Sequence, residues 1–136
     1  MKKAPLLFCA IAALSLTIPE MAQAKYVQAQ LLASYKPTAE LKAFSADRGR
    51  ELFQSTFSGG KPDTPSCTTC HTADPHKQGI TRAGKAISPM ALSKTPDRYR
   101  DVKKVEKWFR RNCKSVLGRI CTDQEKGDFL TFMLGQ

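Results

Sequence analysis

Apolar residues recur at three- and four-residue steps between residues 45 and 57, and this spacing predicts a helix with one buried side. These residues are Ala46, Gly49, Leu52, Phe53 and Phe57. Ser45 or Asp47 provides the N-terminal cap, and the helix runs to about residue 56. Because Gly49 costs a helix roughly 1 kcal/mol relative to alanine, we expect another helix to cross closely at this position.

Two further helices are predicted toward the C-terminus. The first is capped by Thr95, has proline at its first position and covers residues 96–112, with apolar residues on one side and lysines on the other. The second begins with a capping box, in which Thr122 is the cap and Glu125 follows three residues later, and it ends at Leu134.

The remaining segments carry weaker patterns. Residues 25–44 show weak helical periodicity. Residues 58–66 form a loop by their glycine, proline and serine content. Residues 72–95 have no clear period and are predicted to be a long loop wrapped over something apolar. No segment has the pattern of a strand, so the predicted fold class is all-α.

The N-terminus has the layout of an export signal. Lys2 and Lys3 precede an apolar run over residues 6–18, and the small residues of a cleavage site end at Ala24. This layout predicts a secretory signal peptide over residues 1–24, and the apolar run is too short to span a bilayer. Residues 25–136 are then one exported domain, which we expect to be a soluble monomer in the periplasm.

The strongest chemical signal is the run Cys67-Thr68-Thr69-Cys70-His71. Two thiols three residues apart can add to both vinyl groups of one haem, and the adjacent histidine can reach the iron from the same face. The motif therefore predicts one covalently attached haem c, held by Cys67 and Cys70, with His71 as an iron ligand.

Two other uses of the cysteines fit less well. A zinc site could combine Cys67 and Cys70 with Cys113 and Cys121, but the second pair lacks the short step of a zinc knuckle. A thioredoxin-like redox pair needs a strand–helix–strand context, which the pattern does not predict.

The residues alone do not identify the second iron ligand. Met90 is the first candidate, because methionine is the usual ligand in electron-transfer cytochromes c, but it stands only 19 residues after His71 and could instead be a wall of the pocket. His76 is expected to stay on the side of His71. Lys85 is expected to be solvated, and Met133 to lie in the core.

Asn112 is the remaining candidate. It lies on the apolar side of its predicted helix, roughly 20° from Val105, and a buried amide needs a partner. That partner is ordinarily backbone or another side chain, and the iron is the alternative. Asn112 also stands near the predicted helix end, where Cys113 could pair with Cys121 across a short loop and add roughly 2.5 kcal/mol of stability.

Beyond the haem motif, the chain resembles the sphaeroides haem proteins, a ligand-binding branch of the class I cytochromes c. The similarity covers roughly residues 46–136, and its specific parts are Arg111-Asn112-Cys113 and the second cysteine pair. The matching stretches are residues 59–66, 95–98, 105–108, 111–113, 116–119, 121–122 and 125–126.

This resemblance implies that His71 is the proximal ligand, that Asn112 is the distal one, and that Cys113 and Cys121 form a disulfide. In the family the asparagine oxygen binds ferric iron and leaves on reduction. A hard oxygen ligand matches the ferric state better than the softer ferrous state. Reduction then opens a site for oxygen, nitric oxide or carbon monoxide, and the freed Asn112 amide can donate a hydrogen bond there.

The resemblance further implies nitric oxide detoxification by a dioxygenase-like reaction, with electrons from a multihaem cytochrome c and a membrane cytochrome b upstream. Two other functions stay open: a plain electron carrier with Met90 as ligand, and a gas sensor or scavenger without turnover. Arg82, Lys85 and Arg98 are candidates for holding the haem propionates.

The chain carries a net charge of +10. A basic surface on and beyond the 96–112 helix could steer an acidic partner, although a solvated helix face explains it equally well. Nucleic acid is not an expected partner of an exported haem protein. The surface comprises Lys103, Lys104, Lys107, Arg110, Arg111 and Lys114.

Overall fold

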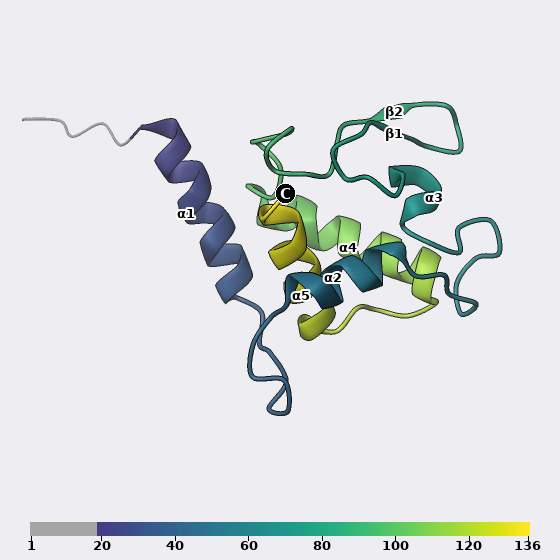
Figure 1. Ribbon diagram of the computed structural model, residues 1–136, viewed down its shortest axis with the longest axis horizontal. Helices are drawn as coiled ribbons and strands as arrows, with labels where there is room; N and C mark the ends of the chain where they lie inside the picture. The colour runs from purple at the N-terminus through teal and green to yellow at the C-terminus, as the bar shows by residue number, and fades with distance from the viewer. Residues whose placement is uncertain (1–18) are drawn as a thin grey trace, which may run out of the picture.

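Figure 1 shows the computed structural model, which describes residues 19–136. Five helices and one short hairpin form the regular structure of this part of the chain, and the all-α class is confirmed. Helices α2 and α5 cross at the centre of the view, with α3 and the hairpin to their right and α1 to their left. The elements are α1 (Glu20–Ala33), α2 (Ala46–Gln54), α3 (Thr68–His71), β1 (Gly79–Ile80), β2 (Ala86–Ile87), α4 (Val102–Leu117) and α5 (Asp123–Leu134).

The close crossing predicted at Gly49 is confirmed, and the partner is α5. A Cβ atom at Gly49 would lie 2.1 Å from the carbonyl oxygen of Asp128 and 2.9 Å from the Cβ atom of Phe132. Both distances are well inside van der Waals contact. Only a residue without a side chain therefore lets the two backbones approach this closely.

The hydrophobic core lies around this crossing. Phe53 of α2 and Met133 of α5 have no exposed surface, as predicted for Met133. Helix α4 joins the core through Phe109, whose ring meets that of Phe129 edge-on at 5.5 Å between centroids. The buried cluster comprises Leu31, Tyr35, Phe53, Met90, Tyr99, Leu130, Phe132 and Met133.

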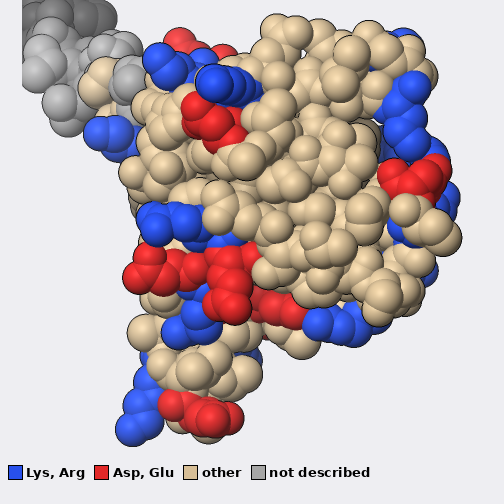
Figure 2. Space-filling model, turned by 45° about the vertical axis from the view of Figure 1, so that its right-hand side comes forward, with Lys and Arg blue, Asp and Glu red and all other residues tan. Residues whose placement is uncertain are grey.

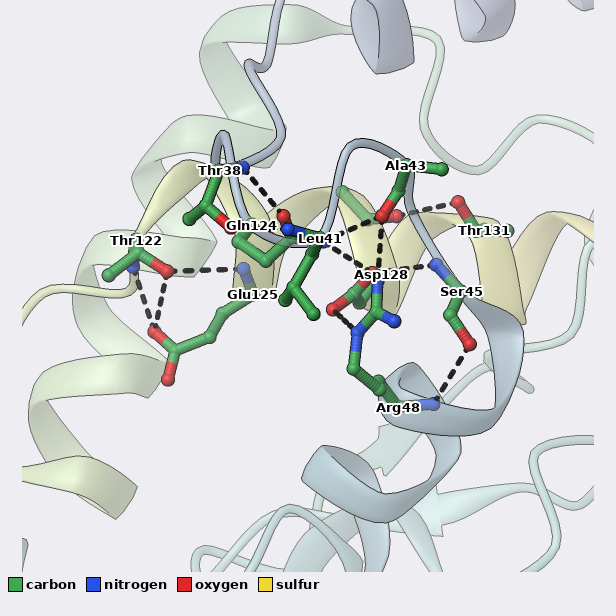
Figure 3. A network of polar contacts seen from close by, with 11 residues as sticks. Thr38, Leu41, Ala43, Ser45, Arg48, Thr122, Gln124, Glu125, Asp128 and Thr131 are labelled. Carbon is green, nitrogen blue, oxygen red and sulfur yellow. Dashed lines mark hydrogen bonds and ion pairs between the residues drawn. The ribbon is translucent and has the colours of Figure 1, made fainter.

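A buried carboxylate ties the segment before α2 to α5 (Figure 3). Asp128 is 4% exposed and accepts hydrogen bonds from the Ser45 amide at 2.7 Å and from the Arg48 guanidinium at 2.8 and 2.9 Å. The side-chain amide of Gln124 donates to the same carboxylate at 2.9 Å, and its oxygen accepts from the Thr38 amide. The charge is thereby paired and hydrogen-bonded, as a buried carboxylate requires.

Two of the predicted helix starts are confirmed. The Ser45 side chain accepts a hydrogen bond from the Arg48 amide at the start of α2. Thr122 and Glu125 make both bonds of a capping box at the start of α5, which ends at Leu134 as predicted.

The predicted start of the 96–112 helix is wrong. Helix α4 begins at Val102, and its cap is Asp101, whose side chain accepts from the Lys104 amide at 2.9 Å. Between Thr95 and this cap, Tyr99 adopts the left-handed conformation with φ +64°, which a continuous right-handed helix cannot contain.

The end of this helix also lies later than predicted. Helix α4 runs to Leu117, and Gly118 follows in the left-handed conformation, φ +74°, which is typical of a helix C-terminus. Asn112 therefore stands more than one turn before the end of the helix.

The predicted absence of strands is wrong in one place within residues 72–95. Gly79 pairs with Ile87, and Ile80 with Ala86, in a two-residue antiparallel hairpin. Gly84 has φ +75° in the connecting turn, where a side chain would be strained. The remainder of this segment is irregular, as predicted.

Most of the predicted signal peptide, residues 1–18, lies outside the described residues. Helix α1 begins at Glu20 and continues across the predicted cleavage point after Ala24. It packs onto the segment before α4, because the Gln28 side chain donates to the carbonyls of Pro96 at 3.3 Å and Arg98 at 2.7 Å. No helix within residues 19–136 has the length and apolar character needed to cross a membrane.

Candidate haem site

The haem motif forms its own short helix. The His71 amide donates to the Cys67 carbonyl at 3.1 Å, and the Ser66 hydroxyl accepts from the Thr68 amide at 3.2 Å just before the first turn. Residues three apart in a helix lie on the same side, so Cys67 and Cys70 point to one side of α3. Within residues 19–136 these two are the cysteines that form no disulfide.

Burial shifts the pKa of both Cys67 and His71 in this motif. It raises the pKa of the Cys67 thiol to about 11, because the charged thiolate is poorly solvated there. Burial, together with the positive charge of Arg98, lowers the pKa of His71 to about 4. At neutral pH the site therefore contains a protonated thiol at Cys67 and an uncharged imidazole at His71.

The imidazole of His71 has an unpaired nitrogen. Its Nδ1 atom is the one buried side-chain nitrogen or oxygen atom in residues 19–136 that lacks a hydrogen-bond partner. An uncharged, sparsely bonded imidazole next to two thiols fits the ligand set of a haem c.

The hairpin packs closely behind this motif. A Cβ atom at Gly79 of β1 would lie 2.1 Å from the carbonyl oxygen of Cys70 and 3.0 Å from the Cα atom of His71. The irregular segment 72–95 thus supports α3 from one side, and a side chain at Gly79 would displace the motif.

Arg98 places a positive charge near the site. Its guanidinium donates to the carbonyl of Pro89 at 2.6 Å and to that of Ser88 at 2.5 Å. These neutral acceptors fix the side chain without cancelling its charge, and no ion pair involves Arg98 within the described part of the chain. Arg82, by contrast, pairs with Asp63.

The predicted burial of Asn112 is wrong, because its side chain is exposed on the surface of α4. Trp108, one turn earlier, is 45% exposed, while Cys113 and Val116 are 6% and 7% exposed. Other parts of the protein therefore bury only some of the side of α4 that the sequence pattern predicts to be apolar. The part that includes Asn112 and Trp108 faces out of the protein core.

A contact further along α4 shows which way this exposed part is turned. The Thr64 hydroxyl lies 2.8 Å from the Ser115 hydroxyl, and Thr64 belongs to the segment that leads into the haem motif. At 100° per residue, Asn112 lies about 60° and Trp108 about 20° around the helix from Ser115. Both side chains thus project from the side of α4 turned toward that segment.

Of the other candidate ligands, Met90 is buried beside the haem motif, Lys85 is exposed and His76 is partly exposed. Met90 is 8% exposed within the core cluster, against which Cys67 also packs, and the Tyr99 hydroxyl donates to its carbonyl at 2.9 Å. The His76 ring lies 3.1 Å from the Asp74 carboxylate. Lys85 is exposed in the hairpin turn.

Cys113 and Cys121 form a disulfide, with 5.6 Å between their Cα atoms. This is the pairing that the resemblance implies. A zinc site of four cysteine thiolates is therefore wrong, because two of its four ligands are joined to each other. The described residues also contain no strand–helix–strand unit of the kind that a thioredoxin-like pair needs.

Sequence reasoning missed the docking of residues 59–64 on the end of α4. The Lys61 amide donates to the Ser115 carbonyl at 2.7 Å, and a Cβ atom at Gly60 would lie 2.2 Å from the same oxygen. The signal was present as Gly59-Gly60, since adjacent glycines permit a close backbone approach.

The charged side chains are unevenly distributed around the molecule. Figure 2 turns the right-hand side of Figure 1 toward the viewer, and a broad area of this face carries neither acidic nor basic side chains. The basic surface predicted on α4 is exposed at each of its residues, and the Arg111 guanidinium lies over the Trp108 ring at 5.2 Å from its centroid. Figure 2 also shows acidic side chains close to basic ones.

Residues 39–133 match the family model described as a domain of unknown function, DUF1924. The cytochrome c-type protein SHP of Cereibacter sphaeroides is 57% identical to this chain over 108 residues, which cover 79% of this chain and 83% of that protein. Cytochrome c'' of Methylophilus methylotrophus is 32% identical over 94 residues, which cover 68% of this chain and 65% of that protein.

Solved structures of the same two proteins share the fold. The structure described as oxidized SHP, an oxygen binding cytochrome c, is 56% identical, has a TM-score of 0.75 and covers 80% of this chain and 96% of that chain. The crystal structure of oxidized cytochrome c'' is 26% identical, has a TM-score of 0.66 and covers 86% of this chain and 97% of that chain. Identity, coverage and fold together show that this chain belongs to the sphaeroides haem protein family of cytochromes c.

Proposed function

We propose that this protein carries one haem c and binds small diatomic ligands at the iron, with Asn112 as a distal ligand that depends on redox state. One observation carries this proposal: α4 exposes Asn112 and Trp108 on the side turned toward the haem-motif segment, while Cys113 and Val116 are buried. The description of SHP as an oxygen binding cytochrome c supports it.

Cys67 and Cys70 are the residues that hold the haem. Each thiol adds its sulfur to one carbon of a vinyl group and its hydrogen to the neighbouring carbon, so the attachment needs no oxidant. His71 is the proximal ligand. Its lowered pKa, about 4, keeps the imidazole uncharged at neutral pH, and a metal-binding histidine must be uncharged.

Arg98 is the residue suited to hold a haem propionate. Its guanidinium is fixed by the carbonyls of Ser88 and Pro89, and its charge acts on His71, which places it at the site. Guanidinium groups bind carboxylates strongly because both partners are charged and planar.

Asn112 controls access to the distal side. The bound haem supplies an iron atom that accepts a sixth ligand. In the oxidised protein the amide oxygen of Asn112 would be that ligand, since hard oxygen donors prefer ferric iron. On reduction the side chain would leave, which would free the position for oxygen, nitric oxide or carbon monoxide. The freed amide then has N–H groups to donate to a small ligand.

Nitric oxide dioxygenation is the finer form of this proposal. One nitric oxide, one oxygen molecule and one electron give one nitrate ion, so turnover needs an electron donor. The exposed lysines and arginines of α4 lie about 80° to 180° around the helix from Asn112. They suit an acidic donor, such as a multihaem cytochrome c supplied by a membrane cytochrome b. Cleavage of residues 1–24 would release the protein into the periplasm, where such donors occur.

The second candidate function is simple electron transfer with Met90 as the distal ligand. Met90 is buried in the cluster that also contacts Cys67, which favours this alternative. Against it, Met90 is enclosed by the core cluster, whereas Asn112 is exposed on the side of α4 turned toward the haem-motif segment.

Absorption spectra of the purified haem protein test these candidates. We expect a high-spin, five-coordinate spectrum in the reduced state and a shift when carbon monoxide is added. Asn112→Ala should leave the reduced spectrum unchanged and convert the oxidised protein to a high-spin form. Met90→Leu is the matched variant and should alter neither state.

The opposite pattern would overturn the proposal. If the reduced protein is low-spin and indifferent to carbon monoxide, with a thioether-to-ferric-iron band that Met90→Leu abolishes, the protein is an electron carrier.

A further inference from the structure

The loop that leads into the haem motif is docked on the last turn of α4. The Lys61 amide donates to the Ser115 carbonyl at 2.7 Å, and the Thr64 hydroxyl donates to the same carbonyl at 3.1 Å. The last carbonyls of a helix have no partner within the helix. This loop therefore supplies bonds that the end of α4 needs.

The backbones approach so closely that glycine is required on both sides. A Cβ atom would lie 2.2 Å from the Ser115 carbonyl oxygen at Gly60 and 2.6 Å from the Leu117 carbonyl oxygen at Gly59. At Gly118, it would lie 1.9 Å from the carbonyl oxygen of Gly59. We call this contact of residues 59–64 with residues 115–118 the clasp.

Thr64 and Ser115 form the side-chain part of the clasp. Thr64 is 8% exposed, and its hydroxyl lies 2.8 Å from that of Ser115. Thr64 stands three residues before Cys67, and Ser115 stands three residues after Asn112. The clasp therefore joins the segment that attaches the haem to the turn that carries the distal ligand.

The Cys113–Cys121 disulfide restrains the same turn of α4, on the side opposite the clasp. Cys113 and Ser115 are two residues apart, so they point about 160° away from each other around α4. Asn112 lies between them in direction, about 100° from Cys113 and 60° from Ser115. The disulfide to Cys121 and the clasp thus restrain the backbone beneath Asn112 on two opposite flanks.

We propose that Thr64 and Ser115 are positioning residues that set how strongly Asn112 holds the oxidised iron. This inference rests on the proposed role of Asn112. Removing the Thr64 hydroxyl loosens the last turn of α4, so a competing ligand displaces Asn112 more easily. In the reduced protein Asn112 is detached, so the clasp has no effect on ligand affinity there.

The test is imidazole binding to the oxidised haem protein and carbon monoxide binding to the reduced one. Thr64→Val removes the hydroxyl at nearly constant volume and should raise imidazole affinity roughly five- to tenfold, the effect of about one hydrogen bond. Carbon monoxide affinity should stay constant. Thr64→Ser keeps the hydroxyl and should restore the imidazole affinity of the unmodified protein.

Two controls separate positioning from general loosening. Thr131→Val removes a hydroxyl that donates to the Gly127 carbonyl at 2.7 Å within α5, and it should not change imidazole affinity. If Thr64→Val does not fold with haem, Ser115→Ala removes the other hydroxyl of the pair but keeps the bond from Thr64 to the Ser115 carbonyl. Ser115→Ala should therefore give a smaller rise in imidazole affinity, and no rise would contradict the proposal.

A double-mutant cycle with Asn112→Ala distinguishes the two possible failures. If Asn112→Ala alone leaves imidazole affinity unchanged, the proposed function is wrong. If Asn112→Ala raises it but Thr64→Val does not, or if Thr64→Val raises it equally in the Asn112→Ala background, only the clasp proposal is wrong.

Discussion

Arg98 carries a charge that the protein holds in place with neutral carbonyls of Ser88 and Pro89. The field that makes protonation of His71 unfavourable also favours an additional electron at an iron bound to that histidine. The charge of Arg98, which we also propose as the partner of a propionate, therefore acts on the potential of the site.

Replacing Arg98 should consequently lower the midpoint potential. For Arg98→Gln we expect a decrease of roughly 60 mV, which corresponds to about 1.4 kcal/mol for one electron. Arg98→Lys retains the charge and should recover most of the potential. Spectroelectrochemical titration measures both variants, and equal potentials in Arg98→Gln and the unmodified protein would contradict the assignment.

For individual residues, the sequence predicted the chemical character of a site better than it predicted how exposed each side chain is. Asn112 could be singled out because an amide interrupts an apolar arc of its helix. Its exposure could not be predicted, because a helical pattern marks which side avoids water without saying whether protein or a cofactor covers it. Gly49 was predictable in full, since its cost to a helix needs a packing reason and the crossing with α5 supplies one.

Helices α2 and α5 depend on one another through the same glycine. Gly49→Ala places a methyl group against the Asp128 carbonyl, so we expect a loss of about 1–3 kcal/mol in the free energy of unfolding. Gly135→Ala is the control, because its nearest neighbour would be at an ordinary 3.4 Å. Chemical denaturation of the haem protein compares them, and equal stability of both variants would refute the close crossing.

A second link between helices responds to pH. The Tyr35 hydroxyl donates to the Glu106 carboxylate of α4, and the Lys126 ammonium of α5 donates to it at 2.9 Å. Partial burial opposes ionisation of Glu106, but these two hydrogen bonds hold its pKa below the usual value. The unfolded chain therefore binds a proton at Glu106 more readily than the folded chain does.

The link should therefore weaken in acid. Its contribution to stability is present above about pH 4.3, the ordinary pKa of glutamate, and is lost as the pH falls through the lower pKa of the folded state. Melting temperatures between pH 6 and pH 3 should fall less steeply for Glu106→Gln than for the unmodified protein. Glu51→Gln, at an exposed carboxyl of α2, should follow the unmodified curve, and parallel curves for all three proteins would disprove the link.

The capping signals in the sequence predicted a helix start correctly only where contacts with the rest of the protein were compatible with it. The Thr122 capping box is satisfied within its own turn, so sequence was sufficient. Thr95 and Pro96 also form a valid local start, but Tyr99 is buried with its hydroxyl on the Met90 carbonyl. Tyr99, with this contact outside any helix, has a left-handed conformation, and the helix begins only at Val102.

For the whole molecule, the decisive question is turnover. Reduced protein mixed with oxygen and then with nitric oxide should produce nitrate, one ion per nitric oxide consumed, and Asn112→Ala should change the rate. Ion chromatography of the products measures this directly. If nitric oxide binds but no nitrate forms, the protein is a sensor or scavenger.

The fold itself sets an order of events. The 68 residues from Ser55 to Thr122 separate α2 from α5, so pairing these helices closes a long loop at a cost of about 4 kcal/mol or more in chain entropy. Such a non-local contact forms slowly. Cys67 and Cys70 lie inside this loop, so a newly delivered chain presents both thiols before its ends meet. The topology therefore favours haem attachment first and closure of the helical core afterwards.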